Sequence, residues 1–138
     1  VVLAAALREG ELPELAFPLS AHVQVNDETL TCAQTPLAAT WQSVLNAGCP
    51  APFAALGEQL GMSRLAESFA AWGLTDAPAL EISTVAAPWE AASADVIREA
   101  VGQGDLLVTP LHMVSVAAIV GNGGERVPLL RQQQRQLY

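Results

Sequence analysis

The apolar and polar positions along the first third of the chain predict one helix and one pair of strands. Residues 1–10 are mostly apolar and end at Gly10, and glycine commonly closes a helix in the left-handed conformation. Residues 22–32 alternate between apolar and polar side chains around turn-forming residues at 26–28, which predicts a short β-hairpin. The two prolines within residues 11–20 indicate an irregular connection.

Apolar residues at helical spacing then predict three helices between residues 40 and 73. Their expected starts are Thr40, Pro50 or Pro52, and Ser63, and their expected ends are Gly48, Gly61 and Gly73. Their aromatic and large aliphatic side chains are expected to form the core: Trp41, Val44, Leu45, Phe53, Leu56, Leu60, Leu65, Phe69 and Trp72.

Two more helices are predicted in the last third of the chain, separated from the others by a loop over residues 75–88. The expected helices are residues 93–101, ending at Gly102-Gln103-Gly104, and residues 111–120, ending at Gly121. Thr109 is expected to cap the last helix and Pro110 to take its first position, where a missing backbone N–H costs nothing.

Together these elements predict a mainly α fold, a helical lobe with one short hairpin and no sheet of its own. The 138 residues and 14.4 kDa fit a single domain over residues 1–138, or one lobe of a larger domain. The core would consist of alanine, leucine and valine, since 51% of the residues are hydrophobic but only 5% aromatic. Residues 127–130 could begin a strand, and the glutamines at 132–134 indicate a solvated end or an unpaired strand.

The charge of the chain excludes several partners and mechanisms. Six basic against fourteen acidic residues give a net charge of −8, so nucleic acids and anionic lipid surfaces should be repelled. All six basic residues are arginine. The absence of lysine excludes a lysine base, a Schiff base and a P-loop lysine within this chain.

The two cysteines and two histidines predict neither a metal site nor a cofactor site. Cys32 and Cys49 form no zinc or CxxC motif, and His22 and His112 add too few ligands. An oxidising compartment would permit a disulfide, but we expect two unpaired, partly buried cysteines. No signal-peptide pattern opens the sequence, and residues 109–112 interrupt the longest apolar run before it reaches membrane-spanning length.

Residues 101–130, VGQGDLLVTPLHMVSVAAIVGNGGERVPLL, resemble a segment of the transpeptidase domain of penicillin-binding proteins. The shared motifs occur in the same order: Gly102-Gln103-Gly104, the helix start Thr109-Pro110-Leu111 with Met113, and Asn122-Gly123-Gly124 followed by Pro128.

The resemblance extends upstream. Residues 40–74 are similar to the family's segment in which a helix leads into Ser-x-Asn and then Phe-Ala-x-Leu-Gly, here Phe53 to Gly57, with a further Leu-Gly at Gly61. Residues 1–10 resemble the helix that begins with the family's Ser-x-x-Lys motif, and residues 75–95 match poorly.

The resemblance implies the helical lobe of an α+β transpeptidase fold and a serine-based chemistry. The family attacks an acyl-D-Ala-D-Ala peptide or a β-lactam with a lysine-activated serine, helped by Ser-x-Asn and a Lys-Thr-Gly strand. The resemblance places the Ser-x-x-Lys motif before Val1 and the Lys-Thr-Gly motif beyond Tyr138. Ser-x-Asn falls on Gly48-Cys49-Pro50, where neither glycine nor proline has a side chain that can relay a proton.

Neither a shifted alignment nor the cysteine restores this chemistry. Ser43 and Asn46 have one residue too many between them and are expected inside the preceding helix. Cys49 precedes a helix start, which favours a thiolate, but no histidine or lysine is near it in sequence, so a semi-buried structural role is favoured. His112 occupies a polar position of the Thr-Pro helix start, and we expect it to serve in surface or junction packing.

Three functions remain open from the sequence. The favoured one is a non-catalytic transpeptidase-like domain with a binding or scaffold role in bacterial peptidoglycan synthesis. The alternative is a fragment of an active D,D-transpeptidase whose serine lies outside this chain. An unrelated acidic helical domain is disfavoured by the ordered matches over residues 40–61 and 102–128.

The resemblance also implies partners and a location. The expected partners are a peptidoglycan stem peptide, a β-lactam or cell-wall synthesis proteins, with no nucleic acid. The expected location is outside the cytoplasmic membrane, tethered by a segment outside this chain. An isolated lobe would expose an apolar face, which suggests a homodimer.

Overall fold

The computed structural model describes residues 1–10, 12–15, 22–80 and 83–126. Within them it contains α1 (Val2–Glu9), β1 (His22–Val25), β2 (Glu28–Thr31), α2 (Trp41–Asn46), α3 (Pro50–Ala71), α4 (Val96–Ala100) and α5 (Pro110–Gly121). The predicted mainly α lobe with a short hairpin is confirmed. The strand predicted at 127–130 and the glutamines at 132–134 lie outside the described residues.

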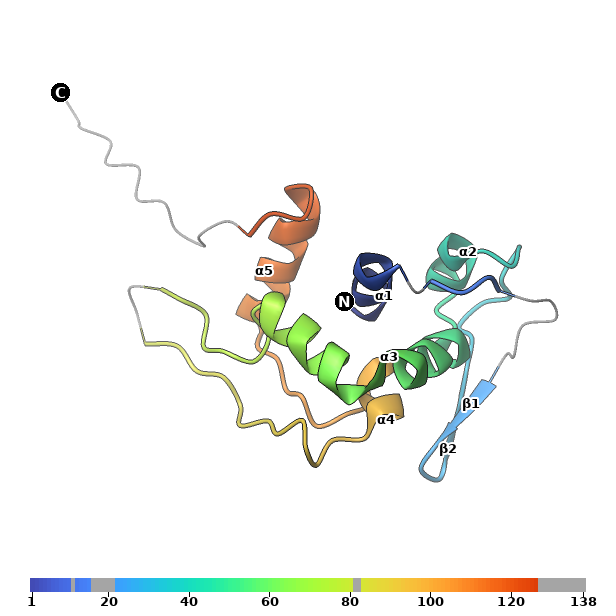
Figure 1. Ribbon diagram of the computed structural model, residues 1–138, viewed down its shortest axis with the longest axis horizontal. Coiled ribbons are helices and arrows are strands. Elements are labelled where there is room, and N and C mark those ends of the chain that lie inside the picture. The colour runs from blue at the N-terminus through green and yellow to red at the C-terminus, as the bar shows by residue number, and fades with distance from the viewer. Residues whose placement is uncertain (11, 16–21, 81–82, 127–138) are drawn as a thin grey trace.

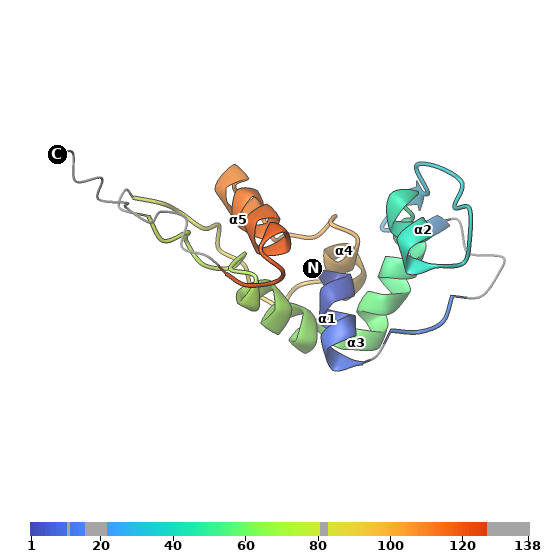
Figure 2. The ribbon, with the colours of Figure 1, turned by 90° about the horizontal axis from the view of Figure 1, so that it is seen from above.

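Helix α3 is the central element, and the others are arranged along it (Figure 1). Helices α1 and α4 pack against α3, while the hairpin contacts it more lightly. Both views place α2 and the hairpin near the N-terminal end of α3, and α5 near its C-terminal end (Figure 2). The main core lies between α1, α3 and α4 and contains Val2, Ala5, Ala6, Leu56, Leu60, Leu65, Phe69, Leu74 and Ala100.

A glycine in the middle of α3 explains why two helices were predicted there. Gly61 has φ 76° and ψ 163°, which is not a helical conformation and is essentially restricted to glycine. Helical structure resumes directly after it, so α3 consists of two helices joined across a kink at Gly61. The prediction of two helices divided at Gly61 is therefore confirmed.

The hairpin is a two-stranded antiparallel sheet with Val25 paired to Glu28 and His22 paired to Thr31. Asn26 occupies the turn with φ 54°, a conformation that asparagine tolerates better than most residues. On one face of the hairpin the Gln24 amide donates a hydrogen bond of 2.6 Å to the Thr29 hydroxyl. The predicted hairpin is thus confirmed.

Two helix starts show how capping side chains decide where a helix begins. The Thr40 hydroxyl accepts a hydrogen bond from the Ser43 N–H, as its predicted role as the cap of α2 requires. Helix α4 begins at Val96 rather than at the predicted Ser93, because the Asp95 carboxylate accepts from the Arg98 N–H and fixes the start there.

The predicted core is correct for Val44, Leu56, Leu60, Leu65 and Phe69, which are all buried. It is wrong for Leu45, which is 57% exposed because α2 is short and lies at the edge of the fold with Val44 as its buried residue. The three aromatic residues at helix ends, Trp41, Phe53 and Trp72, are only half-buried.

Apolar side chains also remain exposed in α5 and in the segment just before it. Leu107, Val108, Met113, Val114 and Val120 are all more than one third exposed, as expected of a lobe with an uncovered face. None of the helices in the described ranges is both long and apolar enough to cross a lipid bilayer. The homodimer stays a prediction.

Candidate functional site

Gly48, Cys49 and Pro50 form the connection between α2 and α3. Gly48 has φ 59°, and a Cβ atom at this position would lie 3.3 Å from the Ala33 Cβ, so glycine suits both the turn and the close neighbour. The Cys49 N–H donates to the Val44 carbonyl at 3.1 Å, which closes α2. Pro50 is the first residue of α3, where its missing N–H leaves no hydrogen bond unmade.

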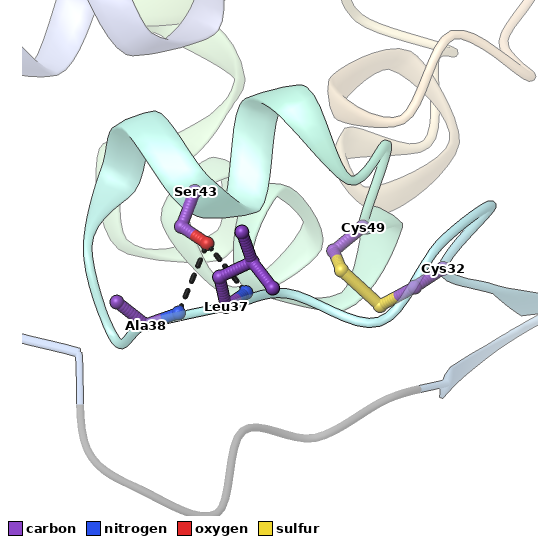
Figure 3. Close-up of a disulfide and its surroundings, with 5 residues drawn as sticks. All are labelled: Cys32, Leu37, Ala38, Ser43 and Cys49. Atoms are coloured by element: carbon purple, nitrogen blue, oxygen red, sulfur yellow. Dashed lines mark hydrogen bonds between the residues drawn. A yellow bond between two sulfur atoms is a disulfide. The ribbon is translucent and has the colours of Figure 1, made fainter.

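Cys49 is joined to Cys32, at the end of the hairpin, by a disulfide (Figure 3). The expectation of two unpaired cysteines is therefore wrong. The backbone brings them together: the Ala33 N–H donates to the Gly48 carbonyl and the Gln34 N–H to the Ala47 carbonyl, at 3.4 and 3.0 Å. The two Cα atoms are 3.9 Å apart. A pairing of this kind depends on contacts between segments and cannot be read from the spacing of the cysteines.

The disulfide decides what this connection can do chemically. Cys49 is 1% exposed and its sulfur is already bonded, so in this state it is not a nucleophile. Glycine and proline contribute no polar side-chain atom on either side of it. The connection at which we expect the Ser-x-Asn motif therefore carries a covalent cross-link.

Ser43 and Asn46, the nearest serine and asparagine, do not replace the missing groups. Both lie in α2, as predicted. The Ser43 hydroxyl accepts hydrogen bonds from the backbone N–H groups of Leu37 and Ala38, at 2.8 and 3.1 Å (Figure 3). This hydroxyl therefore holds the loop between the hairpin and α2, and Asn46 is exposed on the outside of the helix.

Phe53 and Gly57, the next family positions, serve packing. The Phe53 ring meets Trp41 edge to face, with ring centroids 5.7 Å apart, beside a small core of Val44, Ala47 and Cys49. Gly57 is buried where α3 crosses α4. A Cβ atom there would overlap the Ala100 Cβ and approach the Val96 carbonyl oxygen to 3.3 Å. Only glycine permits this approach of the two helices.

The segment Gly102-Gln103-Gly104 wraps around a carboxylate that the sequence analysis missed. Glu99 is 6% exposed, and its Oε1 accepts hydrogen bonds of 2.9 Å from the Trp89 indole N–H and from the Asp105 N–H. A Cβ atom at Gly104 would overlap this carboxylate. Gly104 therefore leaves room for the Glu99 carboxylate in this position, and the carboxylate ties the loop around Trp89 to the chain after α4.

Arg98 also binds the segment that follows α4, from its solvent-exposed side. Its Nε donates to the Gln103 carbonyl at 3.1 Å, and its guanidinium lies 3.6 Å from the Asp105 carboxylate. Gly102 supplies the positive φ of 76° that lets the chain turn back here. A glutamate three residues before a Gly-x-Gly segment is the signal that could have identified this network.

Thr109 and Pro110 begin α5 as predicted, with His112 as an unforeseen partner. The Thr109 hydroxyl accepts from the His112 N–H at 3.3 Å, and the Thr109 N–H donates to His112 Nδ1 at 2.9 Å. His112 Nε2 lies 2.9 Å from the Asp76 carbonyl oxygen, which can only accept, so Nε2 carries the proton and Nδ1 does not. His112 is 1% exposed, so the expectation of surface packing is wrong and that of junction packing is correct.

The family positions do not converge on one pocket. Gly57 lies against α4, the helix that precedes Gly102. The Gly48 connection and the Thr109 cap belong to elements at opposite ends of α3 (Figure 1). Gly123 and Gly124, with φ 68° and 97°, close α5: the Gly124 N–H donates to the Ile119 carbonyl at 2.8 Å. Among the described residues, no three His, Cys, Asp or Glu side chains are grouped to hold a metal ion.

Comparison with known proteins identifies the family. The family of the penicillin binding protein transpeptidase domain matches residues 1–134. Neither a search of curated proteins nor a search of solved structures gave a match. Because the family match covers nearly the whole chain, this chain belongs to the penicillin-binding protein transpeptidase domain family.

Proposed function

We propose that this chain is part of a non-catalytic member of the transpeptidase family, with a binding or scaffold role in bacterial peptidoglycan synthesis. A role in cell-wall synthesis follows from the family. The loss of catalysis and the scaffold role are our inferences.

One observation carries the proposal. The position of the family's Ser-x-Asn motif is occupied by Gly48, Cys49 and Pro50, and the one side chain with a reactive atom is bound in a disulfide. The nearest hydroxyl, on Ser43, is engaged with two backbone N–H groups of the loop before α2. A serine elsewhere would therefore act without the proton relay that this motif supplies.

The packing contacts at the family's motif positions favour a folded domain that serves in binding rather than in catalysis. The close approach at Gly57, the carboxylate under Gly104 and the cap at Thr109 all depend on family positions and are intact. A domain that keeps these contacts keeps the packing of α3, α4 and α5, which a binding or scaffold role needs and catalysis alone does not explain. For this reason we favour binding over an unrelated use of the fold.

The disulfide also fits the location that the family implies. Penicillin-binding protein domains usually lie outside the cytoplasmic membrane, and disulfides form and persist in oxidising compartments of that kind. We therefore infer that this domain works outside the cytoplasmic membrane, near nascent peptidoglycan.

The function is tested with the full-length product of the gene and an acyl-D-Ala-D-Ala stem peptide. We expect the peptide to be retained in equilibrium dialysis while released D-alanine stays at the level of the protein-free blank. An active family member run in parallel shows that the assay detects turnover. Release of D-alanine above the blank would instead establish the alternative, an active D,D-transpeptidase whose serine lies outside this chain.

A further inference from the structure

An open groove of mixed polar and apolar lining reaches the disulfide from one side. It has a volume of about 690 Å³ and lies along the hairpin face that carries His22, Gln24, Thr29 and Thr31. Its other wall is formed by Cys32 and residues 33–36. The residues that line the groove carry no carboxylate and no guanidinium.

The two ends of the disulfide are not equally accessible. Cys32 is partly exposed and lines the groove. Cys49 is 1% exposed and packs in the small core with Val44 and Ala47. A nucleophile that enters the groove therefore meets Cys32 first, and Cys49 is the natural leaving group.

Cys49 packs among apolar side chains, which disfavour a thiolate, but it also lies at the start of α3, which favours one. Cys49 is the N-cap residue of the first part of α3, which runs from Pro50 to the kink at Gly61, and its side chain makes no capping hydrogen bond. Backbone N–H groups at a helix start stabilise negative charge, and a stabilised thiolate leaves faster. Pro50 and Pro52 have no N–H, so Ala51 supplies the first donor of this turn.

The local fold does not depend on the disulfide alone. The hydrogen bonds from the Ala33 N–H to the Gly48 carbonyl and from the Gln34 N–H to the Ala47 carbonyl join the same two segments. Opening the sulfur bond therefore leaves the hairpin and the α2–α3 connection side by side.

From these observations we propose that the Cys32–Cys49 disulfide is a thiol–disulfide exchange site for a dithiol oxidoreductase. A thiolate of the partner attacks Cys32 Sγ, so that a mixed disulfide forms and Cys49 leaves as a thiolate. The second thiol of the partner then attacks the partner's own sulfur in the mixed disulfide and releases Cys32. The partner is oxidised by two electrons, the protein ends with two thiols, and the thiolates take their protons from water.

The exchange is tested on the oxidised full-length product with reduced glutathione as the probe. Samples are quenched in acid, free thiols are alkylated, and the peptides that contain Cys32 and Cys49 are analysed by mass spectrometry. We expect at least about a tenfold excess of the glutathione adduct on Cys32 over Cys49. We also expect reduction of the native protein to proceed within about tenfold of its rate in denaturing urea.

Two variants provide an independent measurement. In Cys49→Ser, the remaining Cys32 is expected to react with glutathione disulfide at least about tenfold faster than the remaining Cys49 does in Cys32→Ser. A smaller preference for Cys32, or a disulfide that is reduced only when urea unfolds the protein, would overturn the proposal and leave a purely structural cross-link. If a variant fails to fold, the position of the glutathione adduct in the wild-type protein still decides between an exchange site and a purely structural cross-link.

Discussion

Substitution of Gly57 by alanine is expected to lower the free energy of unfolding by about 1–3 kcal/mol. The new methyl group would overlap the Ala100 Cβ and press on the Val96 carbonyl, both on α4. Neither neighbour is the end of a flexible side chain, so the two helices must separate and the core between them must loosen. Urea denaturation followed by tryptophan fluorescence measures the loss.

Two further substitutions make this prediction specific. Gly121→Ala provides the matched control, because a Cβ atom there has no neighbour within 4 Å, and its effect should stay within about 0.5 kcal/mol. In the double variant Gly57→Ala with Ala100→Gly the overlap is relieved, so the loss should be smaller than the sum of the single losses by about 1 kcal/mol. Additive losses would show that α3 and α4 do not meet at these residues.

Substitution of His112 by alanine is expected to cost about 2–4 kcal/mol, a second large effect. It removes the acceptor for the Thr109 N–H and the donor for the Asp76 carbonyl, and it leaves a cavity at a fully buried position. Both the start of α5 and the loop after α3 lose their anchor. Urea denaturation measures the cost, and circular dichroism reports the loss of helix.

The neighbouring residue supplies the control. Met113 is 52% exposed on the same helix, and Met113→Ala should change stability by less than about 0.5 kcal/mol. Equal effects at the two positions would mean that His112 is not the junction between α5 and Asp76.

Local signals in the sequence predict most of the helix ends. Gly10, Thr40 and Thr109 act within a few residues of themselves, through a left-handed backbone or a side-chain cap, so their roles can be read without the fold. The start of α4 was placed too early because Asp95 competes as a cap, and the sequence does not rank Ser93 against it.

Contacts between distant segments could not be predicted in the same way. The Cys32–Cys49 disulfide depends on where the hairpin lies against the α2–α3 connection. The hydrogen bond between His112 and Asp76 spans 36 residues, and that between Glu99 and Trp89 joins a loop to a helix. In each case the residue type was visible, but its partner was set by packing.

The degenerate motif is a different case, because the family resemblance predicts its position at Gly48, Cys49 and Pro50. The family motifs on either side fixed the position, and the structure added that Cys49 is cross-linked. The resemblance thus predicts a missing proton relay at this connection, and the structure adds the covalent bond that it contains.

Covalent labelling by a fluorescent penicillin tests the central claim, the absence of catalysis, most directly. The full-length product is incubated with the probe, denatured and separated on a gel, with an active family member as the positive control. We predict no label that survives denaturation. Surviving label that excess unlabelled penicillin blocks would demonstrate a working serine elsewhere in the protein and would contradict the account.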